Sequence, residues 1–104
     1  MTAGPGHGDI WWADLDKVRP VVVLTRRRVA ARLTRLLVAP VTTTIRGLAT
    51  EVPLSAAEGL ASDCVANLDN VQLVPASCLL RRAGTIEPAR WPEFCTAMAK
   101  VMGC

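Results

Sequence analysis

Short apolar segments alternate with turn residues along most of the 104-residue chain. Residues 10–15 are rich in strand-favouring aromatic side chains and form the first predicted strand. Residues 21–25 follow as a continuous, mainly β-branched run, which predicts a strand buried on both faces. Further short strands are expected at residues 36–41, 50–54, 64–68 and 71–74, with turns at Arg46-Gly47 and Gly59.

Two segments carry helical signals instead. Residues 26–32 predict a short basic helix after the second strand. Pro88 fits the first position of a C-terminal helix, where its missing N–H costs nothing. Apolar side chains then repeat at helical spacing, at Trp91, Cys95, Met98 and Met102. Pro92 should deform the first turn or delay the start of this helix. Together the elements predict a mainly β fold, a small and strongly bent barrel with a helix packed on it.

The length fits a single domain over residues 1–104, because a second core would have too few side chains to fill it. Residues 1–7 have neither the basic start nor the apolar stretch of a signal peptide, so we expect a flexible tail. No apolar run approaches the ~20 residues that cross a bilayer. We therefore expect a cytoplasmic protein without membrane contact.

The cysteines lie far apart and form no C-x-x-C pair: Cys64, Cys78, Cys95 and Cys104. Without an export signal, reduced thiols are a better interpretation than disulfides. A zinc site needs closely spaced ligands, and the single histidine, His7, falls in the expected tail. We therefore expect no metal ion and no cofactor. Cys64 and Cys95 lie in apolar runs, which favours core thiols over nucleophiles.

The charges are segregated along the chain. Between Lys17 and Arg46 there are eight basic residues and no acidic one, so the rest of the chain holds four basic and all nine acidic residues. Such segregation predicts a positive face, which is typical of proteins that bind a polyanion. A solvated basic surface without a ligand is the alternative, and charge alone does not decide between them.

Several familiar catalytic sets are absent from the sequence. The glycines at positions 4, 6 and 8 precede a strand instead of following one, so they do not form a dinucleotide-binding loop. An enzyme built from this chain would therefore work without metal, cofactor or histidine. RNA is a suitable substrate because its own 2′-hydroxyl can attack the adjacent phosphorus, provided that the protein holds the geometry and stabilises the extra charge.

Arg19 and Thr42 are the candidate catalytic pair. Arg19 stands directly before Pro20, in the turn that precedes a rigid buried strand, and Thr42 ends another apolar strand. A guanidinium and a hydroxyl could together contact the phosphoryl oxygens. From composition alone, an ordinary surface role is the favoured interpretation of an arginine in a turn and a threonine at a strand end.

Four segments in series resemble those of the MazF/PemK toxin family. The opening strand is GDIWWADL at residues 8–15, and VRPVVVL at residues 18–24 is similar to the family's R-P-V-V-V strand. VAPVTT at residues 38–43 is similar to its third strand, which ends in threonine. SDCV at residues 62–65, followed by DNV at 69–71, is similar to its D-S-V segment and the polar position after it.

The resemblance implies an SH3-like barrel that dimerises and cuts single-stranded RNA at short motifs. It assigns catalysis to Arg19 and Thr42, with the arginine in acid–base roles and the threonine stabilising the pentavalent phosphorus. The products implied are a 2′,3′-cyclic phosphate and a 5′-hydroxyl. A cognate, MazE-like antitoxin silences such enzymes, and the basic groove favours an acidic antitoxin segment that folds on binding.

Two features qualify this assignment. An arginine side chain stays protonated in water at ordinary pH, which favours a charge-stabilising role for Arg19 over a proton-transfer role. Many family members have a long, glycine-rich and acidic loop between the first two strands. Here that loop shrinks to residues 16–18, and the loop's glutamate has no counterpart.

Further residues around the pair are candidates for RNA binding. Trp11 and Trp12 point to opposite faces of a strand, so one should enter the core and the other could stack on a base; burial under the helix or at a dimer contact is the alternative. The remaining candidates are Lys17, with Arg26, Arg28 and Arg46 for phosphates, and Thr43, Thr44 and Asn70 for base edges. Each basic residue could equally belong to a solvated face.

Two other functions fit a barrel of this kind. A non-enzymatic toxin of the CcdB type would inhibit DNA gyrase through its C-terminal helix. A plain RNA-binding barrel would bind RNA and leave it intact. The R-P-V-V-V segment and the strand-end threonine favour the endoribonuclease.

Overall fold

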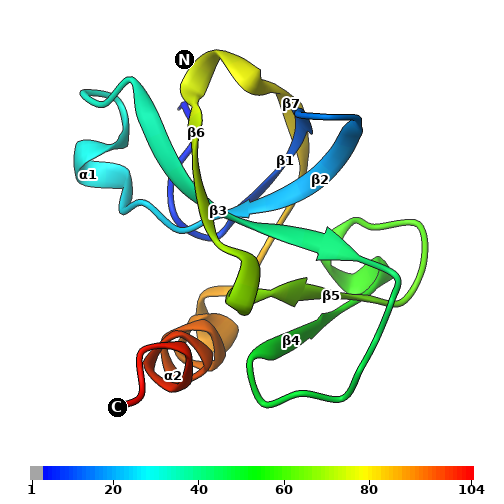
Figure 1. Cartoon of the computed structure of the whole chain (residues 1–104). Coiled ribbons are helices and arrows are strands. Elements are labelled where there is room, and N and C mark those ends of the chain that lie inside the picture. Colours follow the sequence, from blue (N-terminus) through cyan, green and yellow to red (C-terminus); the bar gives the residue numbers. More distant parts are fainter. Residues whose placement is uncertain (1–3) are drawn as a thin grey trace.

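Residues 4–104 are described by a computed structural model, in which seven strands and two α-helices follow one another along the chain (Figure 1). The strands are β1 (Asp9–Asp14), β2 (Val18–Val23), β3 (Arg35–Thr42), β4 (Glu51–Leu54), β5 (Cys64–Asn67), β6 (Gln72–Pro75) and β7 (Leu79–Thr85). The helices are α1 (Arg27–Ala30) and α2 (Trp91–Val101). Short 3₁₀ turns lie at Ala56–Glu58, Leu68–Asn70, Ala76–Cys78 and Pro88–Arg90.

Strand β3 organises the sheet because it pairs with three neighbours in succession. Its first half pairs antiparallel with β6, its middle pairs with β2, and its last residues pair with β5. The strand order is β4-β5-β3-β2-β1-β7, with β6 as a second partner of β3, so the sheet bends strongly without closing. The predicted mainly β, SH3-like fold with a short helix after the second strand and a C-terminal helix is confirmed.

Two apolar cores fill this bent sheet, and β2 contributes to both. Val22 belongs to the core beneath α2, whereas Val21 and Val23 belong to a second core formed with β1, β6 and α1. All three valines are fully buried, which confirms the prediction of a strand buried on both faces. The alternation follows from the pleat, because successive side chains point to opposite faces.

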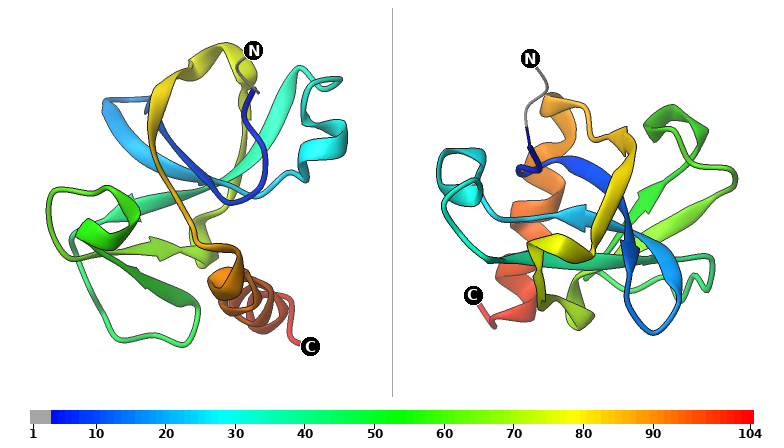
Figure 2. Two further views of the ribbon diagram at one scale, coloured as in Figure 1. Left: turned by 180° about the vertical axis from the view of Figure 1, so that it is seen from behind. Right: turned by 90° about the horizontal axis from the view of Figure 1, so that it is seen from above.

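Helix α2 packs against the bent sheet (Figure 2), and two of its four predicted apolar positions, Trp91 and Met98, pack against the first core. Phe94 and Ala97 are its buried residues, whereas Cys95 is exposed and Met102 is 67% exposed. The prediction of Cys95 as a core thiol is therefore wrong. The buried face is therefore shifted from the predicted one, with Phe94 and Ala97 in place of Cys95 and Met102.

The prolines near α2 have the expected effect. Pro88 opens a 3₁₀ turn, and the α-helix begins only at Trp91 with Pro92 in its first turn. The missing N–H of Pro92 costs nothing there because the first N–H groups of a helix have no partner within it.

Strand β7 was not predicted. Only Leu79 is buried in it, and the sequence LLRRAGT shows neither alternation nor a continuous apolar run. It is a strand because its backbone pairs with β1, with irregular register at two points. The strand conformation of these residues follows from pairing with a distant strand, and no local sequence pattern indicates such a pairing.

Part of the expected tail packs against the domain. Gly6 donates its N–H to the buried carboxylate of Asp9 at 3.1 Å, and Arg27 donates to the carbonyl oxygen of Gly4 at 3.0 Å. The His7 ring lies 5.4 Å from the ring of Trp91. Residues 4–7 of the expected tail therefore contact the folded domain, while residues 1–3 lie outside the described part of the chain. Between residues 4 and 104, no helix is long and apolar enough to cross a membrane.

Candidate active site

A pocket of about 520 Å³ opens where the β1–β2 hairpin, the end of β3 and the segment before β5 meet. In Figure 1 the tip of β3 points to this region, between the hairpin and the green segment that leads into β5. The lining residues are Trp12, Lys17, Arg19, Pro20, Val41, Thr42, Thr43, Gly59, Leu60, Ala61, Ser62 and Cys64. Arg19 and Thr42 therefore share one pocket.

Arg19 lies in strand β2 and not in the preceding turn as predicted, because β2 begins at Val18. Its Nη2 donates to the two carboxylate oxygens of Asp16, at 3.2 and 3.4 Å. The Asp16 side chain is 78% exposed, so this ion pair is weak and easily exchanged for a phosphate. The Nε of Arg19 is buried and has no hydrogen-bond partner among the described residues, so the guanidinium is not saturated by the protein.

Thr42 is the last residue of β3. The β2–β3 pairing runs from Val23–Val38 to Val21–Pro40 and stops there, two residues short of Arg19 on β2 and of Thr42 on β3. Thr42 itself pairs with Val65 of β5. Its Oγ1 accepts a hydrogen bond from the backbone N–H of Thr44 at 3.1 Å, which leaves the hydroxyl hydrogen free to donate to a ligand.

A second, smaller pocket adjoins the first and shares both residues. It is lined by Arg19, Pro40, Thr42, Thr44, Arg46, Asn67 and Asn70. Arg19 and Thr42 thus stand between two hollows, one toward the hairpin and one toward the segment after β5. A chain molecule bound across both hollows would bring its middle to the pair.

Most of the predicted binding residues gather at these two hollows. Trp12, Lys17 and Thr43 line the first, and Thr44, Arg46 and Asn70 line the second. Arg26 and Arg28 are not among the lining residues of either hollow. They lie at α1, beyond the far end of β2 from Arg19. The topology therefore brings together six of the eight candidates and separates two.

The two tryptophans divide as the strand pleat requires. Trp11 packs against the second core, and Trp12 lines the pocket. The guanidinium of Arg81, which is paired with Trp12 across β1 and β7, lies 5.5 Å from the centre of the Trp12 ring. Sequence reasoning missed Arg81 because it missed β7. A ring facing a pocket with a cation behind it is suited to stacking on a nucleobase.

Cys64 lines the pocket without being a candidate nucleophile. Burial raises the pKa of its thiol, and the nearby carboxylates of Glu58 and Asp63 raise it further. Its Sγ donates to the carbonyl oxygen of Leu54 at 3.7 Å. A protonated, hydrogen-bonded thiol is a poor nucleophile, so Cys64 is a structural residue, as the sequence predicted. Among residues 4–104, no three histidine, cysteine, aspartate or glutamate side chains are placed to hold a metal ion.

A family model described as "PemK-like, MazF-like toxin of type II toxin-antitoxin system" matches residues 7–102. The chain belongs to this toxin family. It is 42% identical to "Probable endoribonuclease MazF5" of Mycobacterium tuberculosis over 107 aligned residues, which cover 100% of this chain and 98% of that protein. It is 46% identical to "Endoribonuclease MazF3" of the same species over 86 residues, covering 83% and 84%.

Solved structures of the family agree. The chain superimposes on "Mycobacterium tuberculosis toxin MazF-mt6" with a TM-score of 0.89 and 43% sequence identity, covering 91% of this chain and 96% of that one. The resemblance predicted from four short segments is therefore confirmed. Within this MazF-like chain, the family's R-P and strand-end threonine positions are the two residues that stand between the hollows.

The arginines near and far from the pocket give a first prediction. Arg46→Gln should weaken the binding of an uncleavable RNA oligonucleotide and reduce the salt slope of log K by about 0.7, as expected for one lost phosphate contact with a single strand. Arg28→Gln removes the same charge at α1 and should leave the slope nearly unchanged. Fluorescence anisotropy at several salt concentrations measures both. An equal loss in the Arg28 variant would instead extend the RNA path along α1.

Proposed function

We propose that this chain is the toxin of a toxin–antitoxin pair and a metal-independent endoribonuclease that cuts single-stranded RNA at specific short motifs. The relatives named as endoribonucleases support the activity. The observation that supports the mechanism is the shared pocket of Arg19 and Thr42, a cation and a hydroxyl donor on adjacent rigid strands.

In the proposed reaction the RNA supplies the nucleophile. The 2′-oxygen forms a bond to the adjacent phosphorus and passes its proton to solvent water, while the bond from phosphorus to the 5′-oxygen breaks and that oxygen takes up a proton from water. The products are a 2′,3′-cyclic phosphate and a 5′-hydroxyl. The protein's task is to hold the 2′-oxygen in line and to stabilise the charge that builds on the phosphoryl oxygens.

Arg19 and Thr42 divide that task. The Arg19 guanidinium exchanges Asp16 for the phosphoryl oxygens and stabilises their added charge through two N–H donors. The Thr42 hydroxyl, whose oxygen already accepts from the Thr44 N–H, donates to the same phosphate. Both contacts strengthen as negative charge develops, so they favour the transition state over the bound substrate.

The two hollows accommodate the nucleotides on either side of the cut. Trp12 provides an aromatic face in the first, and Thr43, Thr44 and Asn70 provide hydrogen-bonding groups for base edges. Lys17 and Arg46 sit at opposite sides of the pair and contact flanking phosphates. Recognition of unstacked bases in this way restricts cleavage to single-stranded RNA.

The same groove is the expected target of the antitoxin. A MazE-like partner with an acidic segment would neutralise the toxin by occupying the basic groove, and the chain would act as a homodimer in the cytoplasm, where its RNA substrates are. Binding of such a segment to a surface that leaves the groove open to RNA would contradict this part of the proposal.

Cleavage in the absence of metal tests the function directly. The purified chain should cut a single-stranded RNA in the presence of EDTA, because the reaction needs no metal-bound water. A substrate with one 2′-deoxy nucleotide on the 5′ side of the cut should resist cleavage, since it lacks the attacking hydroxyl. Denaturing gels give the extent of cleavage, and ligation-based sequencing identifies the 5′-hydroxyl ends.

The controls separate the rival functions. DNA of the same sequence should survive, and EDTA-treated and untreated reactions should proceed at equal rates. Inhibition of DNA gyrase by a protein that leaves RNA intact would replace the proposal with the CcdB-type function. RNA binding without cleavage would reduce the chain to an RNA-binding barrel.

A further inference from the structure

We infer that Arg90 is a positioning residue for RNA cleavage, which acts through Glu58 to hold the wall of the pocket formed by residues 59–64. This inference rests on the proposed endoribonuclease function. Arg90 is not among the residues that line the pocket of Arg19 and Thr42. Its effect on the reaction would therefore pass through the protein.

The wall is a loop segment that would be mobile without an anchor. Gly59, Leu60, Ala61, Ser62 and Cys64 line one side of the pocket, and Gly59 to Ser62 lie in the connection between β4 and β5. A single 3₁₀ turn, Ala56–Glu58, precedes them and ends at Gly59 with a φ of +95°. A turn this short has little stability of its own, so contacts with the rest of the domain must fix it.

Glu58 is the anchor point of the turn. Its side chain is only 6% exposed, and its Oε1 accepts a 2.7 Å hydrogen bond from the N–H of Ser55. The Ser55 hydroxyl in turn accepts from the N–H of Ala57, which completes a capping box. The second carboxylate oxygen, Oε2, accepts from Nη1 of Arg90 at 3.0 Å. A buried carboxylate needs such a partner, because leaving it unpaired is costly.

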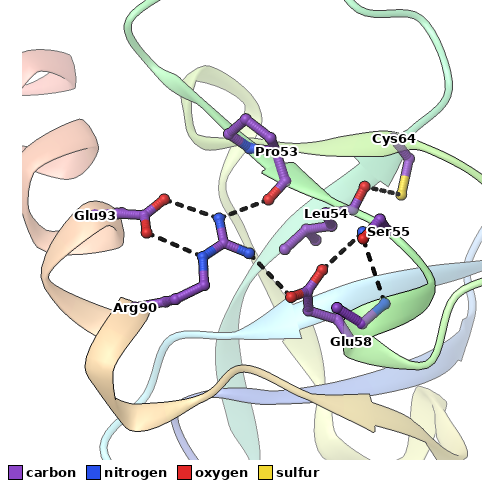
Figure 3. A network of polar contacts seen from close by, with 8 residues as sticks. Pro53, Leu54, Ser55, Glu58, Cys64, Arg90 and Glu93 are labelled. Carbon is purple, nitrogen blue, oxygen red and sulfur yellow. Dashed lines mark hydrogen bonds and ion pairs between the residues drawn. The ribbon is translucent and has the colours of Figure 1, made fainter.

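Arg90 connects this carboxylate to two other elements (Figure 3). Its Nε and Nη2 donate to the carboxylate of Glu93 on α2, at 2.9 and 2.8 Å, and Nη2 also donates to the carbonyl oxygen of Pro53 in β4 at 2.7 Å. One planar guanidinium thereby links the Ala56–Glu58 turn, β4 and α2. The hydrogen bond from Arg90 lowers the pKa of Glu93, so this arm of the network stays charged in mild acid.

Arg90 lies on the outer side of the wall. A separate hollow there is lined by Pro53, Leu54, Ser55, Glu58, Cys64 and Arg90, among others. Cys64 lines both this hollow and the pocket of Arg19, so the two hollows lie on either side of the same segment. Movement of the Glu58 turn away from Arg90 would therefore change the shape of the pocket directly.

The wall residues that line the pocket are uncharged, so they would contact the nucleotide and leave the reacting phosphate to Arg19 and Thr42, which makes the expected effect specific. A displaced wall should weaken substrate binding and relax the choice of cut site. The chemical step depends on Arg19 and Thr42, which are held by β2 and β3, and should continue. A role in folding alone would lower the melting temperature without changing the KM of the folded protein.

The test compares three variants of the full chain on one RNA oligonucleotide and on a long transcript. Arg90→Gln removes the charge that holds Glu58, and Glu58→Gln keeps an oxygen for the Ser55 N–H while losing the ion pair. Both should raise KM about tenfold, leave kcat within about twofold, and broaden the set of cut sites. Glu93→Gln is the matched control, because Glu93 contacts the same guanidinium without touching the turn, and it should leave KM and cut sites unchanged.

Each outcome decides the inference. Unchanged KM and cut sites in both Arg90→Gln and Glu58→Gln, in a wild type that cleaves RNA, would overturn it. A fall in kcat at constant KM, or an equal effect in Glu93→Gln, would overturn it as well. Should Arg90→Gln fail to fold, Glu58→Gln decides alone. A wild-type chain that leaves RNA intact would remove the proposed function and the inference with it.

Discussion

Replacing Arg19 by alanine should reduce kcat for RNA cleavage by about 10²–10³-fold, the usual effect of removing one preorganised donor from a developing oxyanion. The guanidinium is the cation that lines both hollows, and its Nη2 is committed only to an exposed aspartate. Single-turnover cleavage of an oligonucleotide measures the loss. Because the chemistry is affected more than ground-state binding, KM should change far less than kcat.

Two further variants separate chemistry from stability in this prediction. Asp16→Asn removes the ion pair but keeps Arg19, so the melting temperature and the cleavage rate should both stay close to wild type. Arg19→Lys keeps a charge but loses the two-pronged geometry and should recover only part of the activity. Cleavage at the wild-type rate by folded Arg19→Ala would show that the reacting phosphate lies elsewhere.

Replacing Gly84 by alanine should have the largest effect on stability, about 3 kcal/mol or more. Gly84 lies in β7 where that strand passes against the Glu58–Gly59 turn, and a Cβ there would overlap the carbonyl oxygen of Glu58. The obstacle is backbone on both sides, so no side-chain rotation relieves it. The melting temperature should fall by more than about 10 °C, which a thermal scan followed by circular dichroism measures.

Gly4→Ala is the matched control for this substitution. A Cβ at Gly4 meets no atom within 4 Å, and its carbonyl oxygen remains available to Arg27. Its stability should lie within about 0.5 kcal/mol of wild type. A Gly84→Ala variant as stable as the Gly4→Ala variant would mean that β7 and the turn lie farther apart than the structure shows.

The parts of the fold that the sequence predicted are those in which a local pattern and the tertiary environment agree. The valines of β2 form a continuous apolar run because both sides of the strand are buried, and this environment leaves an unmistakable pattern. Strand β7 lacks any such pattern, since its side chains are mostly exposed and its backbone pairing with β1 bridges some 70 positions. Helix α2 was predicted, but its buried face depends on the sheet beneath it.

The candidate site shows the same difference between residues in strands with a clear sequence pattern and residues whose contacts depend on the tertiary structure. Arg19 and Thr42 were predicted from short segments that resemble those of the family, and both lie in strands with a strong apolar pattern. Asp16 and Arg81 contact the candidate residues through hairpin geometry and strand pairing, which no spacing in the sequence reveals. The basic residues of α1 were grouped with the site because they are near in sequence, whereas β2 carries them to its opposite end.

The change of partner along β3 has an evolutionary consequence. This strand pairs with β2 up to Pro40 and with β5 at Val41 and Thr42, and the two hollows that form the groove open at this change of partner. The proposed catalytic residues, Arg19 and Thr42, lie in strands, while the hairpin turn and the β4–β5 connection form the rims of the groove. Insertions and substitutions in those rims can therefore change the RNA specificity during evolution without altering the proposed catalytic residues.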